Sequence, residues 1–136
     1  MNHKLSQLSA MTDEQLNGII ARCLGYNLMD DYRQYNNPLA EKIWFNPQKA
    51  EYVCKLSEFT PCSDHNALTY VTQEVLYQDA GGYINNLVHI LGATNQYHYN
   101  NPNNLWTITL EGVSVLLQSS PRSCVIAAIL VLQYRI

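Results

Sequence analysis

A run of nine apolar residues, 124–132, lies near the C-terminal end of the chain. A helix that crosses a bilayer needs about 20 apolar residues, so this run is too short for a membrane span. Ser120 can cap a helix, Pro121 suits its first position and Arg135 falls in its last turn. The sequence therefore predicts a helix from Pro121 to about Tyr134 that is buried on most sides.

Two further helices are predicted from apolar residues that recur with helical spacing. The first spans about 13–24, where Thr12 and Gln15 have the spacing of a capping box and Gly25 can end the helix. The second spans about 64–78 and ends before a pair of glycines. The apolar stripes are Leu16, Ile19, Ile20, Cys23 and Leu24 in the first helix, and Ala67, Leu68, Val71, Val75 and Leu76 in the second.

The rest of the chain has the pattern of short strands and polar loops. Strands are expected at 42–45 and 51–56 and, as a β-hairpin, within 105–118. Loops are expected at 26–42 and 93–104, after an N-terminal arm of residues 1–11. Residues 83–91 fit a helix better than a strand, although both remain open. This order predicts one domain, 1–136, with an α+β fold: a small antiparallel β-sheet with helices packed on it, an α/β/α-like sandwich.

Amide side chains outnumber charged ones in this chain. Its 136 residues include 14 Asn and 9 Gln against 19 charged residues, and the net charge is -3. General nucleic-acid binders carry basic patches, which a chain with eight scattered Lys and Arg lacks. Eleven acidic residues are also too few for the long acidic faces of a DNA mimic. We expect neither general nucleic-acid binding nor membrane association.

The cysteines predict reduced thiols in a cytoplasmic protein. Cys23, Cys54, Cys62 and Cys124 form no CxxC pair, and residues 1–11 lack the apolar stretch of a secretory signal. Cys54, Cys62 and His65 are spaced unlike the close ligand pairs of structural zinc sites. The sequence therefore predicts no metal site.

Catalysis by Cys62 and His65 is an alternative that the sequence raises. Cys62 precedes a predicted helix N-terminus, a position that can activate a thiol, although an ordinary capping turn explains the same residues. No GxSxG, HExxH, P-loop or GxGxxG motif is present. We expect a chain without enzymatic activity or cofactor, with a small hydrolase using Cys62 and His65 as an alternative.

Aromatic and basic residues in the predicted loops suggest a binding surface. Planar rings and guanidinium groups stack on nucleobases, and a helix N-terminus attracts phosphate. The same loop aromatics also suit packing at the ends of the sheet or a protein interface, and Ser120 and Arg122 also suit an ordinary helix cap. The candidate ligand-binding residues are Arg33, Tyr35, Trp44, Tyr97, His98, Tyr99, Trp106, Ser120 and Arg122.

Three segments carry a family resemblance: 11–21 (MTDEQLNGIIA), 61–68 (PCSDHNAL) and 119–130 (SSPRSCVIAAIL). With them the chain resembles the phage ABA-sandwich domain group of small bacteriophage and prophage proteins. The resemblance implies a counter-defence factor in the cytoplasm of an infected host cell. We expect a homo-oligomer that sequesters a small nucleotide-derived immune signal without catalysis. An inhibitor that occludes a host defence protein is the alternative.

Overall fold

The computed structural model describes residues 2–100 and 105–135. Its elements are α1 (Leu5–Ser9), α2 (Asp13–Cys23), β1 (Asn27–Met29), β2 (Ile43–Asn46), β3 (Glu51–Lys55), α3 (His65–Ile90), β4 (Tyr97–Asn100), β5 (Leu105–Ile108), α4 (Leu110–Leu117) and α5 (Pro121–Leu132). Short 3-10 helices lie at Tyr32–Gln34, Leu56–Glu58, Thr94–Gln96 and Gln133–Arg135. The α+β class with a small antiparallel sheet is confirmed.

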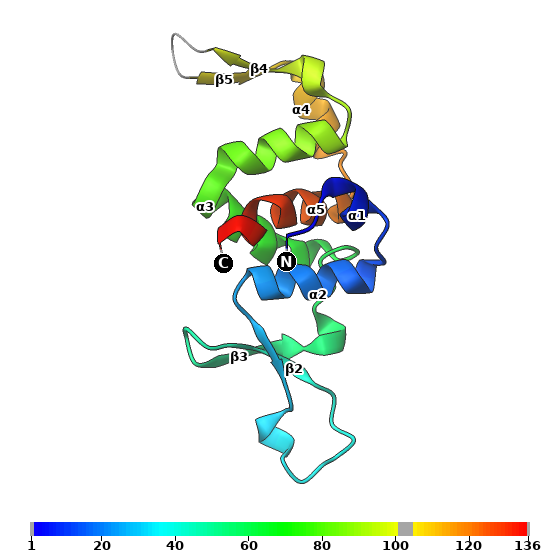
Figure 1. Ribbon diagram of the computed structural model, residues 1–136, viewed down its shortest axis with the longest axis vertical. Helices are drawn as coiled ribbons and strands as arrows, with labels where there is room; N and C mark the ends of the chain where they lie inside the picture. Colours follow the sequence, from blue (N-terminus) through cyan, green and yellow to red (C-terminus); the bar gives the residue numbers. More distant parts are fainter. Residues whose placement is uncertain (1, 101–104, 136) are drawn as a thin grey trace.

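Helix α5 is the central element of the core and lies between α2 and α3 (Figure 1). Its Val125, Ala127, Ala128 and Ile129 are fully buried. The Ser120 side chain accepts a hydrogen bond from the Ser123 amide and caps the helix, with Pro121 in its first turn. The predicted helix, its cap and its burial are therefore confirmed.

The other predicted helix boundaries follow from local caps. Thr12 and Gln15 form the expected capping box of α2, and Gly25 adopts a φ of 87° after the helix. Helix α3 contains both predicted helices, 64–78 and 83–91, joined at a kink at Asp79. The Gly82 amide donates to the Asp79 carboxylate over 2.9 Å, so this side chain caps the second half of α3.

The expectation of an N-terminal arm at 1–11 needs correction, because the described part of this segment packs on the helical body. It contains α1, and its Leu8 is fully buried in the core. His3 and Gln133 also exchange two hydrogen bonds of 2.8 Å between the main chain of one and the side chain of the other. Residues near the two ends of the chain are therefore joined against α5.

The two sheets extend from opposite ends of the helical body (Figure 1). The larger is antiparallel in the order β1-β2-β3, with a bulge where Trp44 pairs with Cys54 and Phe45 with Tyr52. The smaller is the β4–β5 pair, with His98 opposite Thr107. Two expected loops thus contain strands: 26–42 includes β1, and 93–104 includes β4.

Residues 105–118 form a strand and a helix rather than the predicted hairpin. The Thr109 side chain accepts a 3.0 Å hydrogen bond from the Gly112 amide, which starts α4 directly after β5. Gly112 lies so close to the preceding strand that a Cβ atom there would meet Ile108 Cγ1 at 2.7 Å. The strand at 105–108 is therefore confirmed, and its expected partner at 113–117 is wrong.

Candidate functional site: an acidic aromatic cleft

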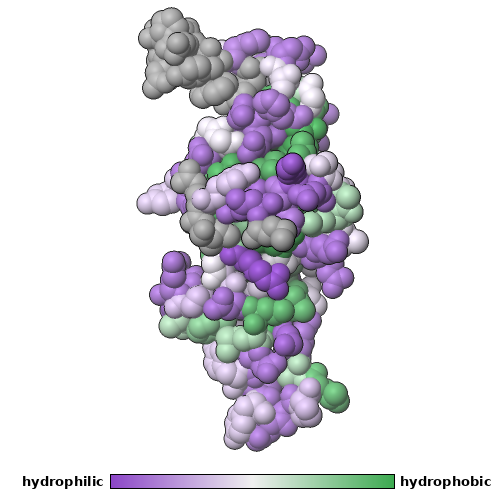
Figure 2. Space-filling view, in the orientation of Figure 1, coloured by the Kyte–Doolittle hydropathy of each residue, from purple (hydrophilic) through white to green (hydrophobic). Residues whose placement is uncertain are grey.

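A cleft of about 500 Å³ lies between strand β3 and the N-terminal part of α3. Residues from the turn before β3 and from the segment after it complete its wall. On the face shown in Figure 2 most of the surface is hydrophilic, and one of the few hydrophobic patches lies at the level of the three-stranded sheet. The cleft residues are Tyr26, Asn46, Lys49, Glu51, Tyr52, Val53, Cys54, Glu58, Phe59, Asp64, Asn66, Ala67 and Tyr70.

Three aromatic side chains, Tyr26, Phe59 and Tyr70, form part of the cleft wall. Phe59 is buried and packs edge-on against Tyr26, with their ring centroids 6.0 Å apart. On the side of the core, the Phe59 ring packs against Trp44, with their ring centroids 6.5 Å apart. Tyr70 on α3 is 69% exposed and adds a ring that a ligand can reach. The cleft thus combines rings held by the core with an accessible one.

Carboxylates outnumber cations along the cleft. Asp64 caps α3 by accepting from the Asn66 amide over 2.9 Å, and Glu58 accepts from the Lys55 amide over 3.1 Å. The Glu51 side chain makes neither a hydrogen bond nor an ion pair with any residue in the described part of the chain. Against these three acids the cleft has one lysine, Lys49.

The pKa of Tyr26 reflects this negative environment. Burial raises it most, and nearby negative groups, including Cys54 as thiolate, Glu74 and Glu51, raise it further. Burial together with the Glu58 carboxylate likewise raises the pKa of the Cys54 thiol to about 11. Both side chains therefore stay neutral at physiological pH, and the carboxylates dominate the electrostatics of the cleft.

Arg33 lies beside this cleft, but its guanidinium group already has partners within the chain. Its guanidinium forms two 2.9 Å hydrogen bonds with the buried Asp31 carboxylate and stacks on Tyr52, with Cζ 3.8 Å from the ring centroid. These bonds from Arg33 hold the pKa of Asp31 below its usual value, although burial opposes them. The sequence predicted Arg33 as a phosphate contact, whereas the structure gives it two partners within the chain. Tyr35, from the same predicted set, is 85% exposed.

Trp44 is a packing residue rather than a surface residue. Its side chain is 1% exposed, and the Arg22 guanidinium carbon lies 5.6 Å from its ring centroid. No face of the ring is open for stacking on a ligand. The expected role of Trp44 in ligand binding is therefore corrected: the ring anchors the sheet on the helices. Burial of so large an aromatic side chain is strongly favourable, and the sequence did not show that this strand packs against the core.

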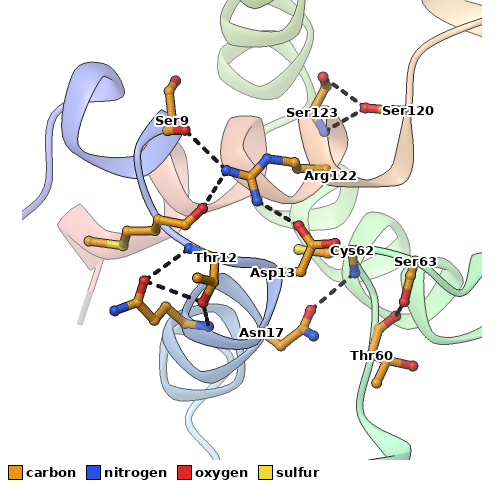
Figure 3. A network of polar contacts seen from close by, with 12 residues as sticks. Ser9, Thr12, Asp13, Asn17, Thr60, Cys62, Ser63, Ser120, Arg122 and Ser123 are labelled. Carbon is orange, nitrogen blue, oxygen red and sulfur yellow. Dashed lines mark hydrogen bonds and ion pairs between the residues drawn. The ribbon is translucent and has the colours of Figure 1, made fainter.

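Ser120 and Arg122 hold the fold together at the start of α5 (Figure 3). Arg122 forms an ion pair with Asp13 over 2.5 Å and donates to the main-chain carbonyls of Ser9 at 3.1 Å and Met11 at 2.5 Å. Ser120 is used by the helix cap. The arginine therefore joins α5 to the link between α1 and α2, and both residues of the predicted anion site already have structural partners.

The remaining predicted residues lie on the β4–β5 pair. His98 is exposed, and its strand partner is Thr107. The strands pair Tyr99 with Trp106 and Tyr97 with Ile108, but the side chains of Tyr97, Tyr99 and Trp106 lie outside what the structure describes. This pair extends from the end of the helical body opposite β2 and β3 (Figure 1). The two predicted groups of aromatic residues therefore do not form one site.

The catalytic alternative finds Cys62 in an unfavourable environment. Cys62 is 4% exposed, and its amide donates to the Asn17 side chain over 3.0 Å. Burial, aided by Asp13 and partly opposed by Arg122, raises the pKa of its thiol from 9.0 to about 12. His65, the first residue of α3, is exposed. The thiol is therefore protonated at neutral pH.

Native Cys62 is expected to react with iodoacetamide roughly a thousandfold more slowly than the same cysteine in the unfolded chain, because the thiolate is the nucleophile. Peptide mass spectrometry after labelling with and without urea measures both rates. Since the folded pKa lies above 9.0, this thiol stabilises the fold fully below pH 9 and loses that contribution as the pH rises toward about 12. Rapid labelling of the folded protein would instead favour the hydrolase alternative.

Sequence reasoning missed the cleft because its residues come from three separate segments. One available signal was Tyr70, which falls outside the apolar stripe of its helix and is therefore an aromatic residue on a polar face. Another was the charge pattern around β3, where Lys49 stands among Glu51 and Glu58. Neither signal reveals that β3 and α3 lie on opposite sides of one cavity.

Within residues 2–100 and 105–135, no three His, Cys, Asp or Glu side chains are grouped as a metal site would require. No single helix of this part is long and apolar enough to cross a bilayer; only α4 and α5 taken together pass that test, and they are bent by 103°. Comparison of the chain with protein-family models, with curated proteins and with solved structures found no match.

Proposed function

We propose that this chain is a binding protein, without catalytic activity, that captures a segment of a partner protein in the cleft between β3 and α3. The observation that carries the proposal is a cavity of about 500 Å³ with aromatic walls. Binding sites are commonly concave, largely apolar and supplied with a few polar groups that orient the ligand. Tyrosine is also enriched where proteins bind one another.

The position of β3 supports a peptide-like ligand. In the order β1-β2-β3 this strand lies at an edge of the sheet, and four of its residues line the cleft. An extended peptide can add to such an edge through main-chain hydrogen bonds, while pockets beside the strand select its side chains. On α3, Tyr70 is 69% and Tyr77 87% exposed, which extends the aromatic surface along the helix beyond the cleft.

Nucleotide sequestration, the first prediction from the sequence, has less support. A nucleotide carries phosphate, and the cleft offers one lysine against three carboxylates. The predicted phosphate contacts Arg33 and Arg122 are both paired with aspartates. Nucleotide capture, a homo-oligomeric state and a counter-defence role in an infected cell therefore stay predictions, and occlusion of a host protein is the role that agrees best with the proposal.

Selection from a library of random peptides tests this function. We expect the immobilised protein to select peptides that bind about tenfold more weakly to the Ala67→Arg variant, because the new side chain fills the cleft from α3. Tyr134→Ala is the matched control, since it removes an aromatic side chain that is 68% exposed and does not line the cleft. Recovery of no peptide whose affinity depends on Ala67 would refute the proposal.

A further inference from the structure

We infer that the cleft binds the side chain of an arginine in that partner segment. This inference rests on the proposed function and names the chemistry that the site selects. It follows from three properties of the cleft: the sign of its charge, the arrangement of its rings, and the way in which the same chain already binds a guanidinium group next to it.

The charge of the cleft calls for a cationic ligand. Among the described residues, Glu51, Glu58 and Asp64 line it with Lys49 as the one cation, so the formal charges of these side chains sum to -2. The Glu51 carboxylate has no hydrogen-bond or ion-pair partner among the described residues. Complementary charge steers a ligand into a site and excludes ligands of the same sign. An arginine supplies the missing charge, whereas phosphate or carboxylate groups are repelled.

The rings of the cleft suit a planar cation with an apolar stem. Tyr26 and Tyr70 present aromatic surface, and a guanidinium or ammonium group is attracted to the face of such a ring. Phe59, Val53 and Ala67 supply apolar wall, against which the methylene groups of a long basic side chain can be buried. The cleft therefore has places for both parts of an arginine side chain.

The Arg33 side chain shows how this sheet binds a guanidinium group. Asp31 receives it through two parallel hydrogen bonds of 2.9 Å, and the Tyr52 ring covers it at 3.8 Å. Tyr52 also belongs to the wall of the cleft. An arginine that enters the cleft would find the same two kinds of group, carboxylate and tyrosine ring. A planar guanidinium exploits this pairing better than a lysine ammonium does.

Titration with N-acetyl-arginine amide tests the inference, and N-acetyl-citrulline amide, which has nearly the same shape without the charge, is the matched probe. We expect the arginine compound to shift the backbone amide NMR signals of Glu51–Cys54 and of Asn66 and Ala67. The citrulline compound should bind at least roughly fivefold more weakly. Raising the salt concentration should weaken the binding of the arginine compound alone.

Glu51→Gln combined with Glu58→Gln should weaken arginine binding by roughly fivefold, while each change keeps an oxygen that can accept a hydrogen bond. Glu111→Gln is the control, because Glu111 lies on α4 and does not line the cleft. Equal affinity for both probes, or shifts outside the cleft, would overturn the inference. If library peptides still bind in the cleft, only the arginine assignment falls; if none does, the proposed function falls with it.

Discussion

Replacement of Trp44 by alanine is expected to lower the free energy of unfolding by about 3–5 kcal/mol. The ring is 1% exposed and packs edge-on against Phe59, which in turn supports Tyr26. Removing it deletes a large apolar surface and leaves a cavity between the sheet and the helices, which the neighbouring side chains can fill only in part. The loss should therefore be among the largest that a single substitution causes in this chain.

Urea denaturation followed by circular dichroism measures this loss. Tyr35→Ala is the control from the same predicted set of ligand residues, because Tyr35 is 85% exposed and its removal should change stability by less than about 0.5 kcal/mol. Trp44→Phe should recover part of the lost stability by refilling the space. Unchanged stability of Trp44→Ala, together with loss of a ligand, would restore the role that the sequence suggested.

Local signals account for the parts of the fold that could be predicted from the sequence. The capping box of α2, the Ser120 cap of α5 and the glycine after α2 each depend on residues within one turn of a helix end. The partners in these interactions lie close together in the sequence, so the pattern of residues is informative alone. The apolar run 124–132 also implied its own burial, because no arrangement on a surface would hide all of its sides.

The segment 105–118 shows where local reasoning failed. Its apolar residues alternate, which is typical of strands, and Glu111-Gly112 has the position of a turn between two strands. The competing signal was Thr109, which caps α4 through the Gly112 amide. Contact of Gly112 with Ile108 then fixes the helix against the preceding strand. Such a close approach depends on tertiary packing, which outweighed the period of the apolar residues.

The candidate site could be predicted only in its general character. Excess tyrosines and few charges suggest a binding surface of aromatic side chains, which stays a prediction; the structure has a cleft lined in part by such residues, at a position that the sequence did not indicate. Whether an aromatic or basic residue is free depends on partners distant in sequence: Trp44 is covered by Phe59, and Arg122 reaches Asp13 across the fold. No spacing rule encodes these contacts, since each joins segments that meet only after the helices have packed.

Arg122→Met is expected to reduce the free energy of unfolding by about 1.5–3 kcal/mol, because three charge-assisted hydrogen bonds disappear while the apolar stem is kept. The acceptors are the Asp13 carboxylate and the main-chain carbonyls of Ser9 and Met11, which join α1 and α2 to the start of α5 (Figure 3). Water can reach the Asp13 side chain, which is 50% exposed, so the ion pair itself should contribute little of this loss.

A double-mutant cycle with Asp13→Asn separates the two contributions. We expect Asp13→Asn alone to cost less than Arg122→Met, since the amide keeps an oxygen acceptor and the two carbonyl contacts remain. A thermal-shift screen with cyclic dinucleotides and ADP-ribose derivatives then addresses the phosphate role that the sequence suggested for Arg122, because a bound ligand raises the melting temperature. If Arg122→Met kept full stability and abolished a nucleotide-induced rise, Arg122 would be a ligand residue. The expected result is the reverse: the variant loses stability, and no nucleotide effect depends on this side chain, because both of its terminal nitrogens already donate to acceptors within the fold.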